Sequence, residues 1–197
     1  MAREIEIKAR ISNPGEIRKK IFNKAVYIGT FEKEDSYWQT DGDNISSNYG
    51  IRIRREDFYY TNGNSKKTVY VTWKTKEIRN GMEFNDEREF EVSSASVFEE
   101  FLAHLGYRKK ISKKKKGSAY SWKNITAEVA EVEGLGWFIE LEIILTNRDE
   151  KLETSAHDSL ICALDELGIE KEAVESRSYT QMLAQLSAQL HAQLRTQ

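Results

Sequence analysis

The stretch Glu4-Ile5-Glu6-Ile7-Lys8 alternates strictly between charged residues and isoleucine. In a β-strand successive side chains point to opposite faces, so the three charges share one face and the two isoleucines share the other. Taken alone, this pattern is typical of a strand with one wet face. It becomes a constraint on the whole fold because the chain repeats it several times.

Similar alternation predicts further strands at 31–40, 50–56, 67–76, 87–92, 125–132 and 137–145. The charges that share a face in these strands carry both signs: Glu4, Glu6, Lys8, Arg52, Arg54, Lys74, Lys76, Glu89, Glu91, Glu128, Glu140 and Glu142. The opposite faces are strongly apolar, as Ile53, Trp73 and Leu141 illustrate. Each strand therefore has one face for a hydrophobic core and one dense with charge.

Four predicted helices could cover the apolar faces: 14–25, 93–105, 149–167 and 178–197. Pro14 follows a capping asparagine, and Gly106 and Gly168 stop the second and third helices. The charged faces then either meet water as an open sheet or line the lumen of a closed barrel. The density of charge of both signs favours the barrel, so the predicted fold class is α+β, with helices packed outside a β-barrel.

Composition narrows the classes of partner. The net charge of the 197 residues is only −2, which argues against a general nucleic-acid binder. The single cysteine, Cys162, excludes an internal disulfide, and no apolar run reaches the roughly 20 residues that span a bilayer. The charged N-terminus predicts that there is no signal peptide. We therefore expect a cytoplasmic protein with neither a nucleic-acid nor a membrane partner.

A charged lumen suits one class of ligand, a polyphosphate with a divalent cation. Lysine and arginine match phosphate oxygens, and arginine can bind two at once. Carboxylates paired on one strand face suit Mg²⁺ or Mn²⁺, which prefer oxygen ligands. The basic stretch 108–116 leaves two interpretations open, a nucleic-acid or nuclear-localisation patch and a solvated strand and turn.

The ordered motifs resemble those of the CYTH superfamily, the triphosphate tunnel metalloenzymes. The matching set is Glu4-x-Glu6-x-Lys8, Arg52-x-Arg54, Lys74-x-Lys76, Glu89-x-Glu91, Lys114-x-Lys116, Tyr120 and the run Val132 to Glu142. The segment Ser178 to Leu183 is similar to the tail of the class IV adenylyl cyclase-like branch, and the resemblance as a whole is to the class IV adenylyl cyclase-like and thiamine triphosphatase-like branch. The resemblance covers residues 1–183 as one CYTH domain, with 184–197 as a C-terminal helical extension.

The resemblance implies an eight-stranded antiparallel barrel, open at both ends, that binds a triphosphate-containing small molecule with Mg²⁺ or Mn²⁺. It implies a catalytic role for Lys8, Glu6 and Glu140, and metal binding by Glu4, Glu6, Glu140 and Glu142. It implies that the triphosphate is held by Lys8, Arg52, Arg54, Lys74, Lys76, Lys114 and Lys116. Lys114 and Lys116 would then point inward, and Lys113 and Lys115 outward.

Ala130 departs from the family pattern, which usually has an aspartate at this position. The missing carboxylate puts a second metal site in doubt, and Glu128, which has the same strand parity, is the candidate replacement. Three functions stay open: metal-dependent hydrolysis of a triphosphate, cyclisation of ATP by a class IV adenylyl cyclase, and binding of polyphosphate or nucleotide without catalysis. The leucines of 178–197 could dock on the barrel or pair with a second copy to form a homodimer.

Overall fold

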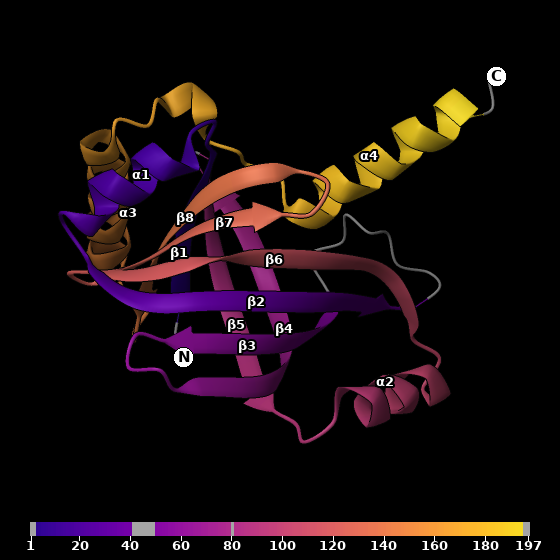
Figure 1. Ribbon diagram of the computed structural model, residues 1–197. Helices are drawn as coiled ribbons and strands as arrows, with labels where there is room; N and C mark the ends of the chain where they lie inside the picture. Colours follow the sequence, from indigo (N-terminus) through magenta and orange to yellow (C-terminus); the bar gives the residue numbers. More distant parts are fainter. Residues whose placement is uncertain (1–2, 41–49, 80, 195–197) are drawn as a thin grey trace.

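The computed structural model describes residues 3–40, 50–79 and 81–194 (Figure 1). Its elements are β1 (Arg3–Arg10), α1 (Pro14–Phe22), β2 (Val26–Gln39), β3 (Ile51–Tyr60), β4 (Ser65–Arg79), β5 (Met82–Glu91), α2 (Ala95–His104), β6 (Arg108–Trp122), β7 (Ile125–Val132), β8 (Gly136–Leu145), α3 (Glu150–Leu167) and α4 (Tyr179–Leu194). A short 3₁₀ helix, Lys171–Ala173, precedes α4. The last three residues of the predicted extension lie outside the described part.

The strands close into a barrel in the order β1-β5-β4-β3-β2-β6-β7-β8. Every neighbouring pair is antiparallel, and β1 closes the ring because it pairs with both β5 and β8. The predicted fold class is therefore confirmed. A closed barrel has no exposed sheet edge, and its alternating side chains point either into the lumen or outward.

The outward faces build the main core against α1 and α3. Ile5 and Ile7 of β1 and Ile139 and Leu141 of β8 are fully buried there, as predicted, together with Leu160 of α3. Each such side chain contributes about 1.5–3 kcal/mol by leaving water. A second core lies beneath α2, on the outer faces of β3 and β4. Figure 1 shows α1 and α3 together on one side of the barrel and α2 beneath another.

Helix ends follow the local signals that the sequence carries. The side chain of Asn13 accepts a hydrogen bond from the backbone N–H of Glu16 and caps α1. Gly168 has φ 70° and ends α3 in a left-handed conformation that suits glycine. Among the described helices, none is both long enough and apolar enough to cross a membrane.

The segment before α4 fastens this helix to the end of β1. Ala9 forms a β-bridge with Val174, and the backbone N–H of Glu175 donates to the carbonyl of Lys8 over 2.9 Å. Tyr179, the first residue of α4, lines the cavity inside the barrel. The later turns of the helix project away from the barrel (Figure 1). The start of α4 belongs to the wall of the barrel.

Candidate functional site

The lumen contains a cavity of about 370 Å³ lined by charged side chains from all eight strands and by the start of α4. The predicted residues that line it are Glu4, Glu6, Lys8, Arg52, Arg54, Lys74, Lys76, Glu89, Glu128, Glu140 and Glu142. The structure adds Lys33, Glu83, Glu87, Lys113 and Lys115. Strand alternation thus brings residues far apart in the sequence to one polar interior.

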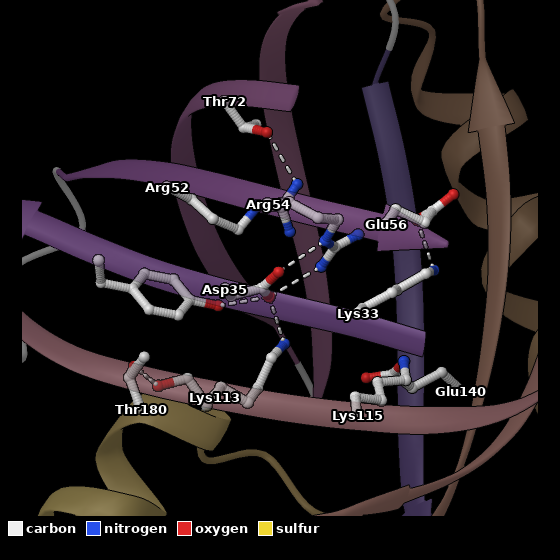
Figure 2. Close-up of polar contacts among 12 residues, drawn as sticks. Lys33, Asp35, Arg52, Arg54, Glu56, Thr72, Lys113, Lys115, Glu140 and Thr180 are labelled. Atoms are coloured by element: carbon white, nitrogen blue, oxygen red, sulfur yellow. Dashed lines mark hydrogen bonds and ion pairs between the residues drawn. The ribbon is translucent and has the colours of Figure 1, made fainter. Parts of the chain in front are cut away.

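One corner of the lumen is built around Asp35 of β2, whose side chain is fully buried (Figure 2). Its carboxylate accepts two hydrogen bonds from Arg54, at 2.8 and 3.0 Å, and lies 3.0 Å from the ammonium of Lys113. Burial alone would raise the pKa of Asp35, but the charges of Arg54 and Lys113 hold it well below its ordinary value. These three residues, here called the Asp35 corner, leave one surplus positive charge facing the cavity.

A second cluster surrounds Lys115 of β6. Its ammonium lies 2.7 Å from Glu128 and also forms an ion pair with Glu140, while Lys33 lies 2.6 Å from Glu128. Burial lowers the pKa of Lys115 to about 8, although Glu128 opposes this shift. Lys33 also reaches Glu56 at 3.5 Å (Figure 2). Two of the predicted metal ligands, Glu128 and Glu140, are therefore ion-paired with lysines.

The carboxylates of β5 hold the cations of the neighbouring strands. Glu83 lies 2.7 Å from Lys8 and 2.5 Å from Lys76. Glu87 lies 2.8 Å from Lys74, and the charges of Lys74 and its neighbours lower the pKa of Glu87 to about 2 although burial opposes them. These contacts fix the lysine side chains in place before any ligand arrives.

Three carboxylates form an acidic patch, defined as Glu4, Glu6 and Glu142. Glu6 of β1 stands directly opposite Glu142 of β8 in the strand register. No lysine or arginine of the described residues forms an ion pair with any of the three; Glu4 accepts a hydrogen bond from Asn85 over 2.9 Å. Burial, then the charge of Glu6, raises the pKa of Glu142 to about 7, and burial raises that of Glu4 well above its ordinary value.

The acidic patch has the donor chemistry for the divalent cation that the resemblance implies. Its carboxylate oxygens suit Mg²⁺ and Mn²⁺, and a cation would offset the burial and the mutual repulsion that raise the pKa values of Glu4 and Glu142. Within the described residues, no three histidine, cysteine, aspartate or glutamate side chains are already gathered closely enough to hold a metal ion. The residues fit the metal by chemistry and charge.

The prediction that Lys114 and Lys116 point inward is wrong. Lys113 and Lys115 face the lumen, with 6% and 5% of their surface exposed, whereas Lys114 is exposed and Lys116 pairs with Glu131 at the outer surface. The register explains the phase, because Lys113 stands opposite Asp35 and cross-strand partners share a face. A run of four lysines has no alternation of its own, so only the pairing with β2 sets its phase.

The expected pair Glu89 and Glu91 on β5 is also placed differently. Glu89 reaches Arg52 from the rim at 3.3 Å, but Glu91 pairs with Lys66 outside the cavity. The deep carboxylates of this strand are Glu83 and Glu87 instead, which lie two residues before and two residues after Asn85 and share its strand face. The only indication of this arrangement in the sequence is that Glu87 lies two residues before Glu89, so that the two side chains share a strand face.

Ala130 is buried in an apolar cluster with Phe31, Ala119 and Phe58. It shares the strand parity of Glu128, so it faces the barrel interior, as the aspartate that the family usually has here would. A neighbouring carboxylate does exist in Glu128, but its two oxygens are taken by Lys33 and Lys115. Apolar contacts of Ala130 therefore take the place of the carboxylate that the family usually has here.

Comparison with known proteins agrees with this architecture. A candidate adenylate cyclase of Methanocaldococcus jannaschii is 26% identical over 181 residues, 91% of this chain and 97% of that protein. The solved PH1819 protein of Pyrococcus horikoshii OT3 is 29% identical, with a TM-score of 0.79 over 92% of this chain and 98% of that one. HpAC1 from Hippeastrum, described as a candidate adenylyl cyclase with a dominant triphosphatase activity, shares the fold at 16% identity and a TM-score of 0.61, over 90% and 91% of the two chains.

The family model of the CYTH domain matches residues 2–179, a range that ends on the tyrosine at the start of α4. The match includes every strand of the barrel and every charged residue of the lumen. The chain therefore belongs to the CYTH domain family.

Proposed function

We propose that this protein binds a triphosphate together with Mg²⁺ or Mn²⁺ inside the barrel and hydrolyses its terminal phosphoanhydride. The observation that carries the proposal is a single lumen in which fixed cations stand beside carboxylates that have no cation partner in the described part of the chain. Phosphoryl transfer depends mainly on positioning and on neutralising charge on the phosphoryl oxygens. Both requirements are supported by this arrangement.

The cations of the lumen would hold the phosphate chain. Arg52, Arg54, Lys74 and Lys76 come from two adjacent strands, and Lys113 and Lys115 take the place of the lysines that the sequence predicted. Most are already bound to a buried carboxylate, so their side chains lose little freedom when a phosphate arrives. Lys8, fixed by Glu83 at 2.7 Å, would stabilise charge at the reacting phosphoryl group.

The acidic patch would hold the divalent cation. Glu4, Glu6 and Glu142 are the carboxylates of the lumen that form no ion pair with a described residue, and Glu140 could join them on release from Lys115. The bound metal would supply charge neutralisation and polarise a phosphoryl oxygen. Water then attacks the terminal phosphorus and releases a proton to solvent, and the shortened phosphate chain leaves with the electrons of the broken P–O bond.

Two other outcomes have an observation in their favour. The M. jannaschii relative is named as a candidate adenylate cyclase, which favours attack by the ribose hydroxyl of ATP on the α-phosphate. The burial of Ala130 against Phe31, where the family usually has an aspartate, favours a binding protein without catalysis. The three functions share one binding mode and differ in their products.

Product analysis separates them. We would incubate the protein with tripolyphosphate or ATP and Mg²⁺ or Mn²⁺, and measure phosphate, pyrophosphate and cyclic AMP. Phosphate release supports the triphosphatase, and cyclic AMP with pyrophosphate overturns it in favour of the cyclase. Turnover by Ala130→Asp alone would identify the natural chain as a binding protein.

A matched pair of variants ties the activity to the lumen. Lys74→Met removes a cation that lines the cavity and should lower kcat/KM about 10- to 100-fold, the usual effect of losing a charged hydrogen bond. Lys67→Met removes a lysine that is 75% exposed on the same strand and should leave kcat/KM unchanged. Equal activity of the two variants would place the reaction outside the barrel.

A further inference from the structure

Tyr179, the first residue of α4, lies between the helix and the charged lumen. Its exposed fraction is 7%, and its ring packs edge-to-face on Phe138 with 5.0 Å between centroids. The ammonium groups of Lys113, Lys8 and Lys115 lie 5.0, 5.5 and 6.0 Å from the centre of the same ring. Three cations from two strands therefore converge on one phenol that lines the cavity.

The hydroxyl of Tyr179 is buried and has no hydrogen-bond partner among the residues that the structure describes. Buried tyrosine hydroxyls usually find a partner, so this exception calls for an explanation. Burial raises the pKa of Tyr179 well above its ordinary value, and the charges of Glu6 and Glu128 add to the shift. The hydroxyl therefore keeps its proton and is available as a donor.

The position of the ring is fixed from behind by the segment that precedes α4. Glu175 accepts hydrogen bonds from Arg177 at 2.8 and 2.5 Å and from Arg10 at 3.4 Å. Ser178 then caps the helix, because its hydroxyl accepts from the backbone N–H of Gln181 while the Gln181 side chain accepts from the backbone N–H of Ser178. The phenol is thus held in place without its hydroxyl taking part.

We propose that Tyr179 is a substrate-binding residue whose hydroxyl donates a hydrogen bond to a phosphoryl oxygen of a triphosphate held by Lys8, Lys113 and Lys115. The inference rests on the proposed function, since it needs a triphosphate in the lumen. An anion that draws on these three ammonium groups would lie beside the ring that they surround. The start of α4 is then part of the binding site.

Tyr179→Phe tests the proposal because it removes one oxygen atom and keeps the ring contacts. Tyr120→Phe is the matched control, since Tyr120 is a buried tyrosine of the outer core, away from the lumen. Calorimetry would give the Kd of tripolyphosphate, and of ATP, for the full chain without added divalent cation, so that no turnover interferes. Melting temperatures without ligand would show that each variant is folded.

We expect Tyr179→Phe to weaken both ligands by about tenfold or more, as loss of a hydrogen bond to a charged group does. Its ligand-free melting temperature should equal or exceed that of the natural chain, because the unpartnered hydroxyl is gone. Unchanged affinity in Tyr179→Phe, or a loss confined to ATP, overturns the phosphoryl contact while the proposed function stands. Absence of binding to the natural chain also overturns the contact, whereas the proposed function is overturned only if the product analysis with Mg²⁺ or Mn²⁺ shows no phosphate release.

Discussion

The Asp35 corner and the acidic patch are two charge clusters of the same lumen, and they are balanced in opposite ways. Asp35 holds Arg54 and Lys113 within 3.0 Å, so the pKa of its carboxyl falls well below the ordinary value. Glu142 faces Glu6 and has no ion pair among the described residues, and burial, then the charge of Glu6, raises its pKa to about 7. One cluster contains its own counter-charges, and the other does not.

The difference indicates that the carboxylate of the Asp35 corner has a structural role, whereas the acidic patch is suited to binding. At the Asp35 corner the chain neutralises its own cations and fixes their geometry, so the barrel wall depends on that carboxylate. At the acidic patch the repulsion persists in the ligand-free protein, and a divalent cation would relieve it. Removing a carboxylate should therefore have opposite effects on stability in the two places.

The largest expected effect comes from Asp35→Ala. This change leaves Arg54 and Lys113 buried without their counter-charge, which should lower the free energy of unfolding by about 3–5 kcal/mol. Urea unfolding followed by circular dichroism would measure the loss. Asp57→Ala is the control, because Asp57 pairs with an exposed lysine and should lose less than about 1 kcal/mol. Equal losses would mean that burial does not distinguish the corner.

The second-largest expected effect tests which lysines of β6 face the lumen and bind the ligand. Lys113→Met should weaken binding of tripolyphosphate about 10- to 100-fold, because it removes a cation of the lumen. Lys114→Met changes the adjacent, exposed lysine and should leave the Kd unchanged. Calorimetry at low salt would compare them. A larger loss in Lys114→Met would restore the phase that the sequence alone suggested.

The sequence predicts the barrel well because its signal is local. Alternation at 4–8 and 137–145 needs no partner strand to be recognised, and β7 begins and ends where the pattern does. Strand lengths are harder to predict. β2 starts at Val26 rather than 31 and β5 at Met82 rather than 87, since pairing with longer neighbours extends strands whose own residues do not alternate.

Site residues are predicted correctly only where the alternation within a strand itself shows which side chains point into the lumen. Arg52 and Arg54 alternate with isoleucine, so their direction follows from the chain. Asp35 lies in the run Glu32 to Asp35, which is charged at every position, and its burial depends on the register with β3 and β6. Long-range pairing decides such residues, and a single sequence does not contain that information in local form.

The third effect should reverse the sign of the first. Glu142→Gln removes a charge that Glu6 repels and should raise the free energy of unfolding by about 1–2 kcal/mol in buffer without divalent cations. Glu140→Gln, two residues away on β8, removes a partner of Lys115 and should lower it instead. Denaturant unfolding at pH 8 would compare them. If both variants lost stability, the acidic patch would be structural like the corner.

The smallest expected effect concerns Glu175, a carboxylate that, like Asp35, is paired with two cationic side chains, here arginines that are partly exposed. Hydrogen bonds from Arg177 lower the pKa of Glu175 to about 2, although its two arginine partners are nearly half exposed. A lowered pKa stabilises the fold above the unfolded value of about 4.3, and this contribution is lost as the pH falls through about 2. Solvent screening limits it to about 1 kcal/mol. Glu175→Gln should therefore be less stable than the natural chain at pH 6, and the gap should close as the pH approaches 2, in urea unfolding at each pH. If the difference in stability between the two proteins did not change with pH, the loss in Glu175→Gln would come from packing and not from charge. Burial would then be the feature that makes the ion pairs of the Asp35 corner strong.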